Sequence, residues 1–455
     1  MIKEKHDLLV IDAAAEKLGF KQIFKKIRKF NPEIIGITTN ISIAYICCEL
    51  ALRIKINFPN KKIVMGGPWA TSNFEYIINH KIGDYVIIGE GEYTFQKLLS
   101  YIESGKIEQI DEINGIAYRD RQKEVRITKR APFIQDLDAL PYPAWEYFPK
   151  SSKYFTHYRH LPLYPMMITR GCPYGCIHCT KTVHGYKIRK RSVENVIGEM
   201  KYLIEKFKAN EIIIVDDNFT FDVDYANKIL DKIIEEELNV HLLLPNGIRA
   251  DTLTPPLLMK MRRAGVYGFA IGVESGVQAI VNKIGKKLDL NKVRNAARLA
   301  KRYGFLLRAF FILGLPYDSF DTMRQTIRFA REIEPDFAYF FIATLFPGTE
   351  MYDIVRDMGN MEDFMSDTCN DKEERENFNV DLGFFYKPVI NFTYGKMKPG
   401  DVENAYKIAV RDFYMRPRKI LSILGTIKSI PEIKWIFHYF IVSLSNIISS
   451  IFKKK

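Results

Sequence analysis

Three cysteines lie close together in this chain: Cys172, Cys176 and Cys179 follow the pattern C-x3-C-x2-C. Thiolates bind zinc and iron–sulfur clusters, and a sealed structural zinc site has four protein ligands. Three thiolates leave one metal position open for a substrate or a cofactor. Gly171 and Gly175 suit a loop that wraps closely around a cluster, because glycine permits tight turns without side-chain bulk. The spacing therefore predicts an iron–sulfur cluster with one iron free for chemistry.

A zinc ion is the alternative occupant, with His178 or His184 as its fourth ligand. Structural zinc sites usually combine two short ligand pairs, and no second C-x2-C or H-x3-H pattern lies nearby. The other cysteines, Cys47, Cys48 and Cys369, are isolated from this group. The spacing favours the open iron–sulfur site over zinc.

A repeating series of strands and helices must position the cysteines. Apolar runs predict six strands, at Met166–Arg170, Glu211–Val215, His241–Ile248, Tyr267–Val273, Leu306–Leu313 and Phe337–Thr344. Helical periodicity fills the intervals, notably at Val193–Phe207, Asn291–Tyr303 and Asp321–Ile333. Six such units predict a partial barrel, in which active residues belong at the carboxyl ends of the strands. The cysteine loop follows the first of these strands.

Two carboxylates and an arginine follow the second and third predicted strands. Asp216 and Asp217 end the second strand, where one carboxylate can hold a ligand ammonium group and the other can cap the next helix. Arg249 ends the third strand and can grip a carboxylate in a bidentate fork, although a solvated surface arginine is the commoner outcome.

Further candidates follow the fourth and fifth predicted strands. Glu274 and Ser275 offer a carboxylate and a hydroxyl suited to ribose hydroxyls, and Ser275 is equally suited to cap a helix. Gly314 would let a flat base approach the backbone, or it simply marks a turn. We expect the ligand role for Glu274 and leave both readings open for Ser275.

The N-terminal part of the chain predicts a second, open parallel α/β sheet. Its strands are expected at Asp7–Asp12, Ile34–Asn40, Lys62–Gly67 and Tyr85–Gly89. Glycine runs, Gly66-Gly67-Pro68 and Gly89-Glu90-Gly91-Glu92, end two of these strands, where ligands of such sheets bind. A proline-rich stretch, Leu137–Pro149, predicts a domain boundary.

Composition limits the class of protein and its compartment. The chain has 455 residues, of which 47% are hydrophobic, so it can bury more than one sizeable core. Six cysteines with a single tight cluster indicate a reducing interior, and no N-terminal signal peptide is visible, which predicts a cytoplasmic protein. The net charge of +13 admits nucleic acid or an anionic membrane surface as a partner.

The C-terminal segment favours the membrane surface. Residues 416–455 are basic and apolar, and Trp435–Phe452 contains no Asp, Glu, Lys or Arg. The segment is too polar for a transmembrane span, so a helix lying in the interface of the inner face of the cell membrane is expected. A helix packed on the protein itself is the alternative.

With the cysteine loop and the strand-end residues together, the chain resembles the radical SAM enzymes. In that superfamily three cysteines hold a [4Fe-4S] cluster, whose fourth iron binds S-adenosylmethionine, and reductive cleavage gives a 5′-deoxyadenosyl radical. The resemblance implies that Cys172, Cys176 and Cys179 are the cluster ligands. It also implies that the S-adenosylmethionine site is formed by Asp216 or Asp217, Arg249, Glu274 and Gly314. One departure is His178, where an aromatic carbon ring is usual.

The N-terminal sheet narrows the resemblance to the subgroup with a cobalamin-binding domain. The residues that carry it are Gly66-Gly67-Pro68, Gly89-Glu90-Gly91-Glu92, Leu140-Pro141-Tyr142-Pro143-Ala144-Trp145 and Asp216-Asp217-Asn218-Phe219. The corrin is expected to face the barrel from two loops, with contacts at Thr38, Ser42, Gly66 and Gly67. A full domain of this type has another strand and helix before Asp7–Asp12, so this one is expected to be truncated. The chain also has no D-x-H-x-x-G motif.

The resemblance implies an enzyme with three cofactors: a [4Fe-4S] cluster, S-adenosylmethionine and cobalamin. The expected domains are 1–136, a Rossmann-like cobalamin-binding type; 137–160, a linker; 161–358, a partial (β/α)6 barrel; and 359–455, a helical basic extension. We expect methylation of an unactivated carbon of an apolar, lipid or isoprenoid substrate, with ferredoxin or flavodoxin as electron donor. Radical carbon–carbon bond or ring formation, RNA modification and a non-catalytic iron–sulfur sensor are the alternatives.

Overall fold

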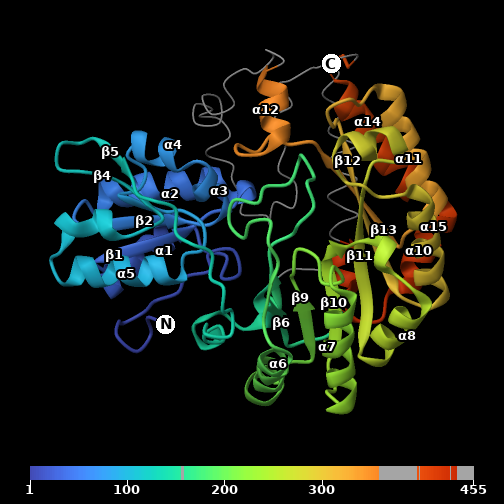
Figure 1. The fold of residues 1–455 in the computed structure, drawn as a ribbon, viewed down its shortest axis with the longest axis horizontal. Coiled ribbons are helices and arrows are strands. Elements are labelled where there is room, and N and C mark those ends of the chain that lie inside the picture. The colour runs from blue at the N-terminus through green and yellow to red at the C-terminus, as the bar shows by residue number, and fades with distance from the viewer. Residues whose placement is uncertain (155–157, 358–396, 399, 431, 438–455) are drawn as a thin grey trace.

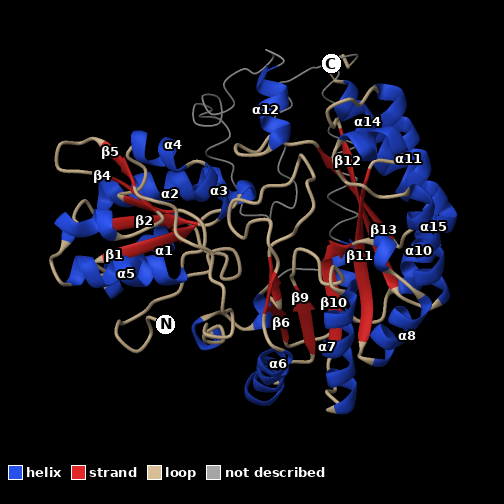
Figure 2. Ribbon diagram, in the orientation of Figure 1, coloured by secondary structure: helices blue, strands red, loops and turns tan. Residues whose placement is uncertain are grey.

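The chain folds into two α/β units built on separate sheets. The computed structural model describes residues 1–455 except 155–157, 358–396, 399, 431 and 438–455. The N-terminal unit, blue and cyan, lies beside the larger barrel unit, green to red (Figure 1). Figure 2 shows that each unit places its strands inside and its helices outside. This arrangement confirms the mixed α/β class with a Rossmann-like unit, a barrel and a helical C-terminal region.

The N-terminal sheet has the strand order β1-β2-β3-β4-β5. Its strands are β1 (Ile34–Thr38), β2 (Lys62–Gly66), β3 (Tyr85–Ile87), β4 (Ile116–Arg119) and β5 (Val125–Ile127). Strands β1 to β3 run parallel, whereas β4 and β5 are antiparallel additions at one edge. Its helices are α1 (Phe20–Phe30), α2 (Ala44–Asn57), α3 (Pro68–Ser72), α4 (Phe74–Asn79) and α5 (Glu92–Glu103). The sheet is therefore mixed, not purely parallel.

One predicted strand of this unit is wrong. Asp7–Asp12 forms an irregular segment and makes no strand hydrogen bonds with the described part of the chain. Its apolar residues still pack, since Ile11 joins the core that contains Ile37 and Met65. Apolar alternation marks a segment that packs against a core, but a strand also needs a neighbouring backbone to pair with. Among the described residues, β1 is the end strand of the sheet and pairs only with β2.

The barrel unit contains a six-stranded parallel sheet, as the sequence predicts. In spatial order it contains β13 (Phe337–Ile342), β12 (Leu306–Leu313), β11 (Val266–Glu274), β10 (His241–Ile248), β9 (Glu211–Ile214) and β6 (Leu163–Met166). Every residue of β11 is buried, as is typical of a parallel strand covered on both faces. The covering helices include α6 (Val193–Phe207), α7 (Val223–Glu235), α8 (Pro255–Arg263), α10 (Leu290–Arg302) and α11 (Phe320–Ile333).

The first barrel strand ends earlier than the sequence predicts. Strand β6 stops at Met166, and Thr169–Arg170 forms a separate strand, β7, paired antiparallel with β8 (Arg189–Lys190). The chain leaves the sheet because the backbone N–H groups of Ile168 and Thr169 donate to the carboxylate of Asp216 instead of a neighbouring strand. The β7–β8 ribbon holds together the two ends of the cysteine loop, which comprises residues 171–188.

The helical C-terminal region packs on the barrel. Its described helices include α12 (Glu350–Asp357), α14 (Asp401–Tyr414) and α15 (Pro417–Thr426). Trp435, the first residue of the segment expected at a membrane interface, is buried with its ring 5.8 Å from that of Phe337. Most of that segment, residues 438–452, lies outside the described residues. Among the described helices, none combines the length and hydropathy needed to cross a membrane.

Candidate active site

Backbone contacts hold the cysteine loop in a compact shape. The N–H of Cys172 donates to the carbonyl of Gly185 at 3.3 Å, and the N–H of Ile177 donates to the carbonyl of Ile284 at 3.1 Å. Gly171 has a φ of 93°, and a side chain there would overlap the carbonyl oxygen of Lys187. Glycine is therefore required at Gly171, where the loop passes close to its own segment before β8.

The three cysteines are free thiols with graded exposure: Cys172 is buried, Cys176 is intermediate and Cys179 is exposed. Lys181 Nζ donates to Cys179 Sγ at 3.2 Å, which places a positive charge beside this thiol. The described residues contain no group of three His, Cys, Asp or Glu side chains placed to share one metal ion. A [4Fe-4S] cluster does not need such convergence, because each thiolate binds a different iron. The donor set therefore fits a cluster. Cys369 lies outside the described residues.

The carboxylate of Asp216 binds the start of the cysteine loop. Asp216 is buried and accepts hydrogen bonds from Ile168 N (2.6 Å), Thr169 N (3.0 Å) and Thr169 Oγ1 (2.8 Å). Burial raises the pKa of Asp216 to about 6, against the lowering effect of these donors. Asp217, by contrast, is exposed. The amide oxygen Oδ1 of the next residue, Asn218, is buried with no hydrogen-bond partner among the described residues.

Arg249 also contacts the cysteine loop. Its guanidinium binds both carboxylate oxygens of Asp251, at 2.9 and 2.6 Å, and the carbonyls of Lys286 and Lys287, both at 2.8 Å. The same group lies 4.0 Å from the ring centroid of Tyr174, within the loop. These partners occupy the fork that the sequence assigns to a ligand carboxylate.

Glu274 ends β11 in a left-handed conformation, with a φ of 67°. Its Oε1 accepts a hydrogen bond of 2.8 Å from Lys286 Nζ and lies 4.0 Å from Nε2 of His178. Burial alone would raise the pKa of Glu274, but Lys286 and His178 outweigh it and the pKa falls. The Nδ1 atom of His178 is buried without a hydrogen-bond partner among the described residues. Unpartnered polar atoms on both His178 and Asn218 are what a site for a polar cofactor should contain.

Two other sequence candidates have internal partners. Ser275 is buried, and its Oγ lies 3.2 Å from Thr326 Oγ1 and accepts from Val277 N at 3.2 Å. Gly314 has a φ of 83°, and its N–H donates to Asp318 Oδ2 at 3.2 Å. These contacts shape the strand ends beside Glu274.

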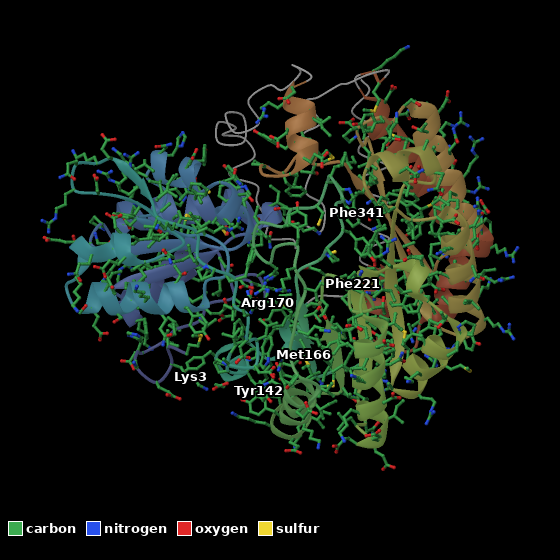
Figure 3. All side chains as sticks on the ribbon, in the orientation of Figure 1. Lys3, Tyr142, Met166, Arg170, Phe221 and Phe341 are labelled. Carbon is green, nitrogen blue, oxygen red and sulfur yellow. The ribbon has the colours of Figure 1, made fainter. Side chains whose placement is uncertain are left out.

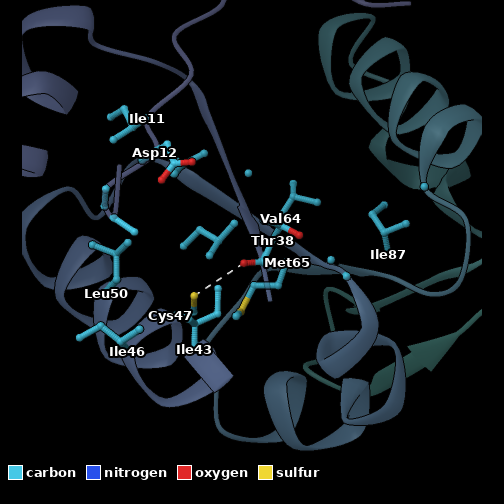
Figure 4. Close-up of a pocket in the computed structure, with 18 of the residues that line it drawn as sticks. Ile11, Asp12, Thr38, Ile43, Ile46, Cys47, Leu50, Val64, Met65 and Ile87 are labelled. Carbon is cyan, nitrogen blue, oxygen red and sulfur yellow. Dashed lines mark hydrogen bonds between the residues drawn. The ribbon is translucent and has the colours of Figure 1, made fainter. Parts of the chain in front are cut away.

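The four N-terminal candidates lie together at the carboxyl edge of their sheet. Thr38, Ser42, Gly66 and Gly67 all line one large cavity. Figure 4 shows the part of it beside Thr38, whose carbonyl accepts a hydrogen bond of 3.6 Å from Cys47 Sγ. Gly67 has a φ of 94°, and a Cβ there would lie 2.9 Å from Thr38 Oγ1.

This cavity has a volume of about 2270 Å³ and is lined by both units. The barrel contributes His178, Glu274 and several apolar residues at the ends of β12 and β13, but the three cysteines are not among its lining residues. Typical pockets for drug-sized ligands measure roughly 300–1,000 Å³. The cavity is therefore large enough for a macrocycle together with a smaller molecule, which fits cobalamin.

Sequence reasoning missed the residue that joins the two units and a lysine that holds one of the site carboxylates. Glu90 of the N-terminal unit accepts hydrogen bonds from Arg170 and Arg189 of the barrel unit, and Lys286 holds Glu274 within the barrel unit. Arg170 lies where the N-terminal unit meets the barrel (Figure 3). Glu90 lies within the glycine run that ends a predicted strand, and Arg170 lies two residues before Cys172, so their positions could have indicated a role at the site. Lys286 lies in no motif.

Comparison with known proteins agrees with this geometry. Residues 166–330 match the radical SAM superfamily, and residues 1–99 match the B12 binding domain. An uncharacterized methyltransferase of Pyrococcus horikoshii is 33% identical over 78% of this chain and 76% of its own length. The cytidylyl-2-hydroxyethylphosphonate methyltransferase of Streptomyces wedmorensis is 28% identical over 73% of this chain and 68% of its own length.

Solved structures share the fold. The radical S-adenosylmethionine methyltransferase TsrM of Kitasatospora setae, with tryptophan and an S-adenosylmethionine analogue bound, aligns with a TM-score of 0.66. The alignment covers 79% of this chain and 72% of TsrM, at 17% identity. The two matched domains imply the three cofactors expected from the sequence: a [4Fe-4S] cluster, S-adenosylmethionine and cobalamin. The chain therefore belongs to the radical SAM methyltransferase family whose members carry a B12 binding domain.

Proposed function

We propose that this enzyme methylates an unactivated carbon of a small apolar substrate inside the cavity between its two units. One observation carries the proposal. A single cavity is lined both by Gly66 and Gly67, at the edge of the N-terminal sheet, and by His178 and Glu274, beside the cysteine loop. A methyl donor held by one unit and a radical source held by the other would thus meet the same substrate.

Different residues of the chain would hold the cluster and S-adenosylmethionine. When bound, the cluster and S-adenosylmethionine supply a 5′-deoxyadenosyl radical, and cobalamin supplies the methyl group. Cys172, Cys176 and Cys179 would hold the cluster. Glu274 would bind ribose hydroxyls through Oε2, to which no described residue donates, while Lys286 fixes Oε1.

Other polar groups would complete the S-adenosylmethionine site. Asn218 Oδ1 and His178 Nδ1, both without hydrogen-bond partners among the described residues, would meet its polar atoms. Asp217, being exposed, remains available to a ligand ammonium group. Asp216 and Arg249 would act on the cofactor through the cysteine loop that they support.

Aromatic side chains on the barrel side of the cavity support an apolar substrate. The ring of Phe310 lies 5.6 Å from that of Tyr339 and 5.8 Å from that of Phe341. Phe310 and Phe341 line the cavity, and Phe341 is 48% exposed (Figure 3). Edge-on aromatic rings favour flat or apolar groups, since burial of apolar area against them is the main gain in free energy.

Reduction would come from outside the chain. A low-potential one-electron donor such as ferredoxin or flavodoxin would reach the cluster from the side of Cys179, the exposed member of the three cysteines. We place the domain limits at 1–136, 137–160, 161–358 and 359–455, with the electron-transfer face on the third of these.

Formation of 5′-deoxyadenosine by the anaerobically reconstituted protein under strong reductant tests the radical chemistry. Cys172→Ala, Cys176→Ala and Cys179→Ala should each abolish it. Cys47→Ala should retain it, because Cys47 contacts Thr38 in the other unit. A parallel visible spectrum with added cobalamin should show a bound corrin. Absence of 5′-deoxyadenosine in the loaded wild type would contradict the proposal.

A further inference from the structure

The β7–β8 ribbon brings two arginines face to face at the base of the cysteine loop. Arg170 and Arg189 are directly opposed partners in this antiparallel pair. Like charges placed opposite each other destabilise a two-stranded pair. Their side chains are 15% and 3% exposed, so water screens them poorly. The ribbon that closes the loop therefore needs a counter-charge.

Glu90 supplies that charge from the other unit. Its Oε1 lies 3.0 Å from Arg170 Nη1, and its Oε2 lies 2.8 Å from Arg189 Nη1. The Glu90 side chain is 2% exposed and also accepts from Ile134 N at 2.7 Å and contacts His184 Nδ1 at 3.2 Å. One carboxylate thus contacts both strands of the ribbon, the end of the N-terminal domain at Ile134 and the far part of the loop at His184.

The environment keeps this carboxylate ionised. Burial alone would raise the pKa of Glu90, but hydrogen bonds from His184, Arg189, Ile134 N and Arg170 outweigh it and hold the pKa well below its usual range. Removing one member of such a buried pair leaves the other charges uncompensated. Glu92 assists from a more exposed position, 31% exposed and 2.5 Å from Arg170 Nη2.

We infer that Glu90 is a positioning residue that fixes the base of the cysteine loop to the cobalamin-binding unit. Its contacts set the loop against the rim of the shared cavity, which Glu90 itself lines together with Gly89 and Gly91. The effect of this placement on catalysis rests on the proposed function. The effect of Glu90 on the order of the loop is independent of that function.

Hydrogen exchange of the apoprotein tests the inference without any cofactor. Glu90→Gln keeps the shape of the side chain but removes its charge. Backbone amides of residues 171–188 should exchange at least tenfold faster in this variant than in the wild type. Glu92→Gln is the matched control, since it removes a carboxylate from the same arginine at the exposed end, and its effect should stay below threefold. Equal exchange in Glu90→Gln and wild type would overturn the inference.

A double variant separates positioning from a general loss of folding. Arg170→Gln removes one of the opposed guanidinium groups, so the pair Glu90→Gln/Arg170→Gln should exchange more slowly at residues 171–188 than Glu90→Gln alone. If Glu90 only stabilised its own unit, Arg170→Gln would give no such rescue, and the inference would fail. Failure to form 5′-deoxyadenosine with normal exchange behaviour would instead count against the proposed function alone.

Discussion

Gly285 lies directly against the carbonyl of Gly175, so that a Cβ on Gly285 would overlap that oxygen. Gly285 has a φ of 70° and follows Ile284, whose carbonyl accepts a hydrogen bond from the cysteine loop at Ile177. The segment after α9 (Gln278–Lys283) is therefore the floor on which the loop rests.

Gly285→Ala should displace the cysteine loop. Alanine at a positive φ costs about 1 kcal/mol in any position, and here the Cβ must also push the Gly175 carbonyl away. Iron content after anaerobic reconstitution should fall at least severalfold. Gly304→Ala is the control, since Gly304 has a φ of 71° but no atom of the described residues lies within 4 Å of an added Cβ. This variant should lose the same backbone contribution to the free energy of unfolding but keep its normal iron content.

Arg249→Lys should loosen the loop although the charge is kept. Lysine cannot bind Asp251 bidentately, contact two carbonyls and lie flat on Tyr174 at once. We expect the free energy of unfolding to fall by about 2 kcal/mol, the scale of a lost charged hydrogen bond.

Arg294→Lys provides the comparison for that loss. Arg294 also binds a carboxylate, Glu332, and lies 4.8 Å from the ring of Phe329, but its side chain is 42% exposed. Its replacement should cost less than about 1 kcal/mol, as exposed ion pairs do. Urea unfolding measures both variants, and equal losses would contradict the role given to Arg249.

Alkylation should distinguish the cysteines of the two units. Cys47 is buried in α2, and burial raises the pKa of its thiol to about 11, so little thiolate forms at neutral pH. The pKa of the Cys179 thiol is also raised, by the loss of solvation, but Lys181 opposes this rise and the residue is exposed to the reagent. Iodoacetamide should label Cys179 of the apoprotein at least tenfold faster than Cys47, as read by peptide mass spectrometry. Labelling of Cys47 at a comparable rate would show that the N-terminal core opens readily.

Lys419 should make stability depend on pH in the alkaline range. Burial lowers the pKa of Lys419 to about 8, and its Nζ donates to the carbonyl of Pro335. The unfolded chain holds this proton to near pH 10.5, so unfolding between pH 8 and 10.5 takes up a proton. The free energy of unfolding should therefore rise with pH over this window in the wild type relative to Lys419→Met, by up to about 3 kcal/mol. A constant difference between the two proteins would contradict the lowered pKa.

The periodic parts of the fold were predictable from the sequence. Five of the six barrel strands and the helices between them were found, because parallel strands such as β11 are continuous apolar runs and their helices are amphipathic. The first predicted strand, Met166–Arg170, shares only Met166 with β6. The errors fall where pairing decides the structure. Asp7–Asp12 has no strand neighbour among the residues that the structure describes, and Thr169–Arg170 pairs with a segment that lies beyond the cysteine loop.

The site could be predicted only in part for a related reason. The residue types at the strand ends were visible, but their partners were not. Asp216 meets Thr169 from 47 residues away, and Glu90 meets Arg170 from 80 residues away. The first contact depends on how distant segments of the barrel pack and the second on how the two units pack, and neither local spacing nor periodicity contains that information.

The Glu90 contacts also impose thermodynamic linkage on the enzyme. A carboxylate shared by two units makes the ordering of one a condition of the ordering of the other, and coupling between binding free energies is reciprocal. Whatever orders the cysteine loop must therefore tighten the rim of the N-terminal cavity, and whatever fills that cavity must favour the ordered loop by the same amount. Binding at the cysteine loop and binding in the N-terminal cavity therefore become cooperative, even though the two sets of binding residues lie on different sheets.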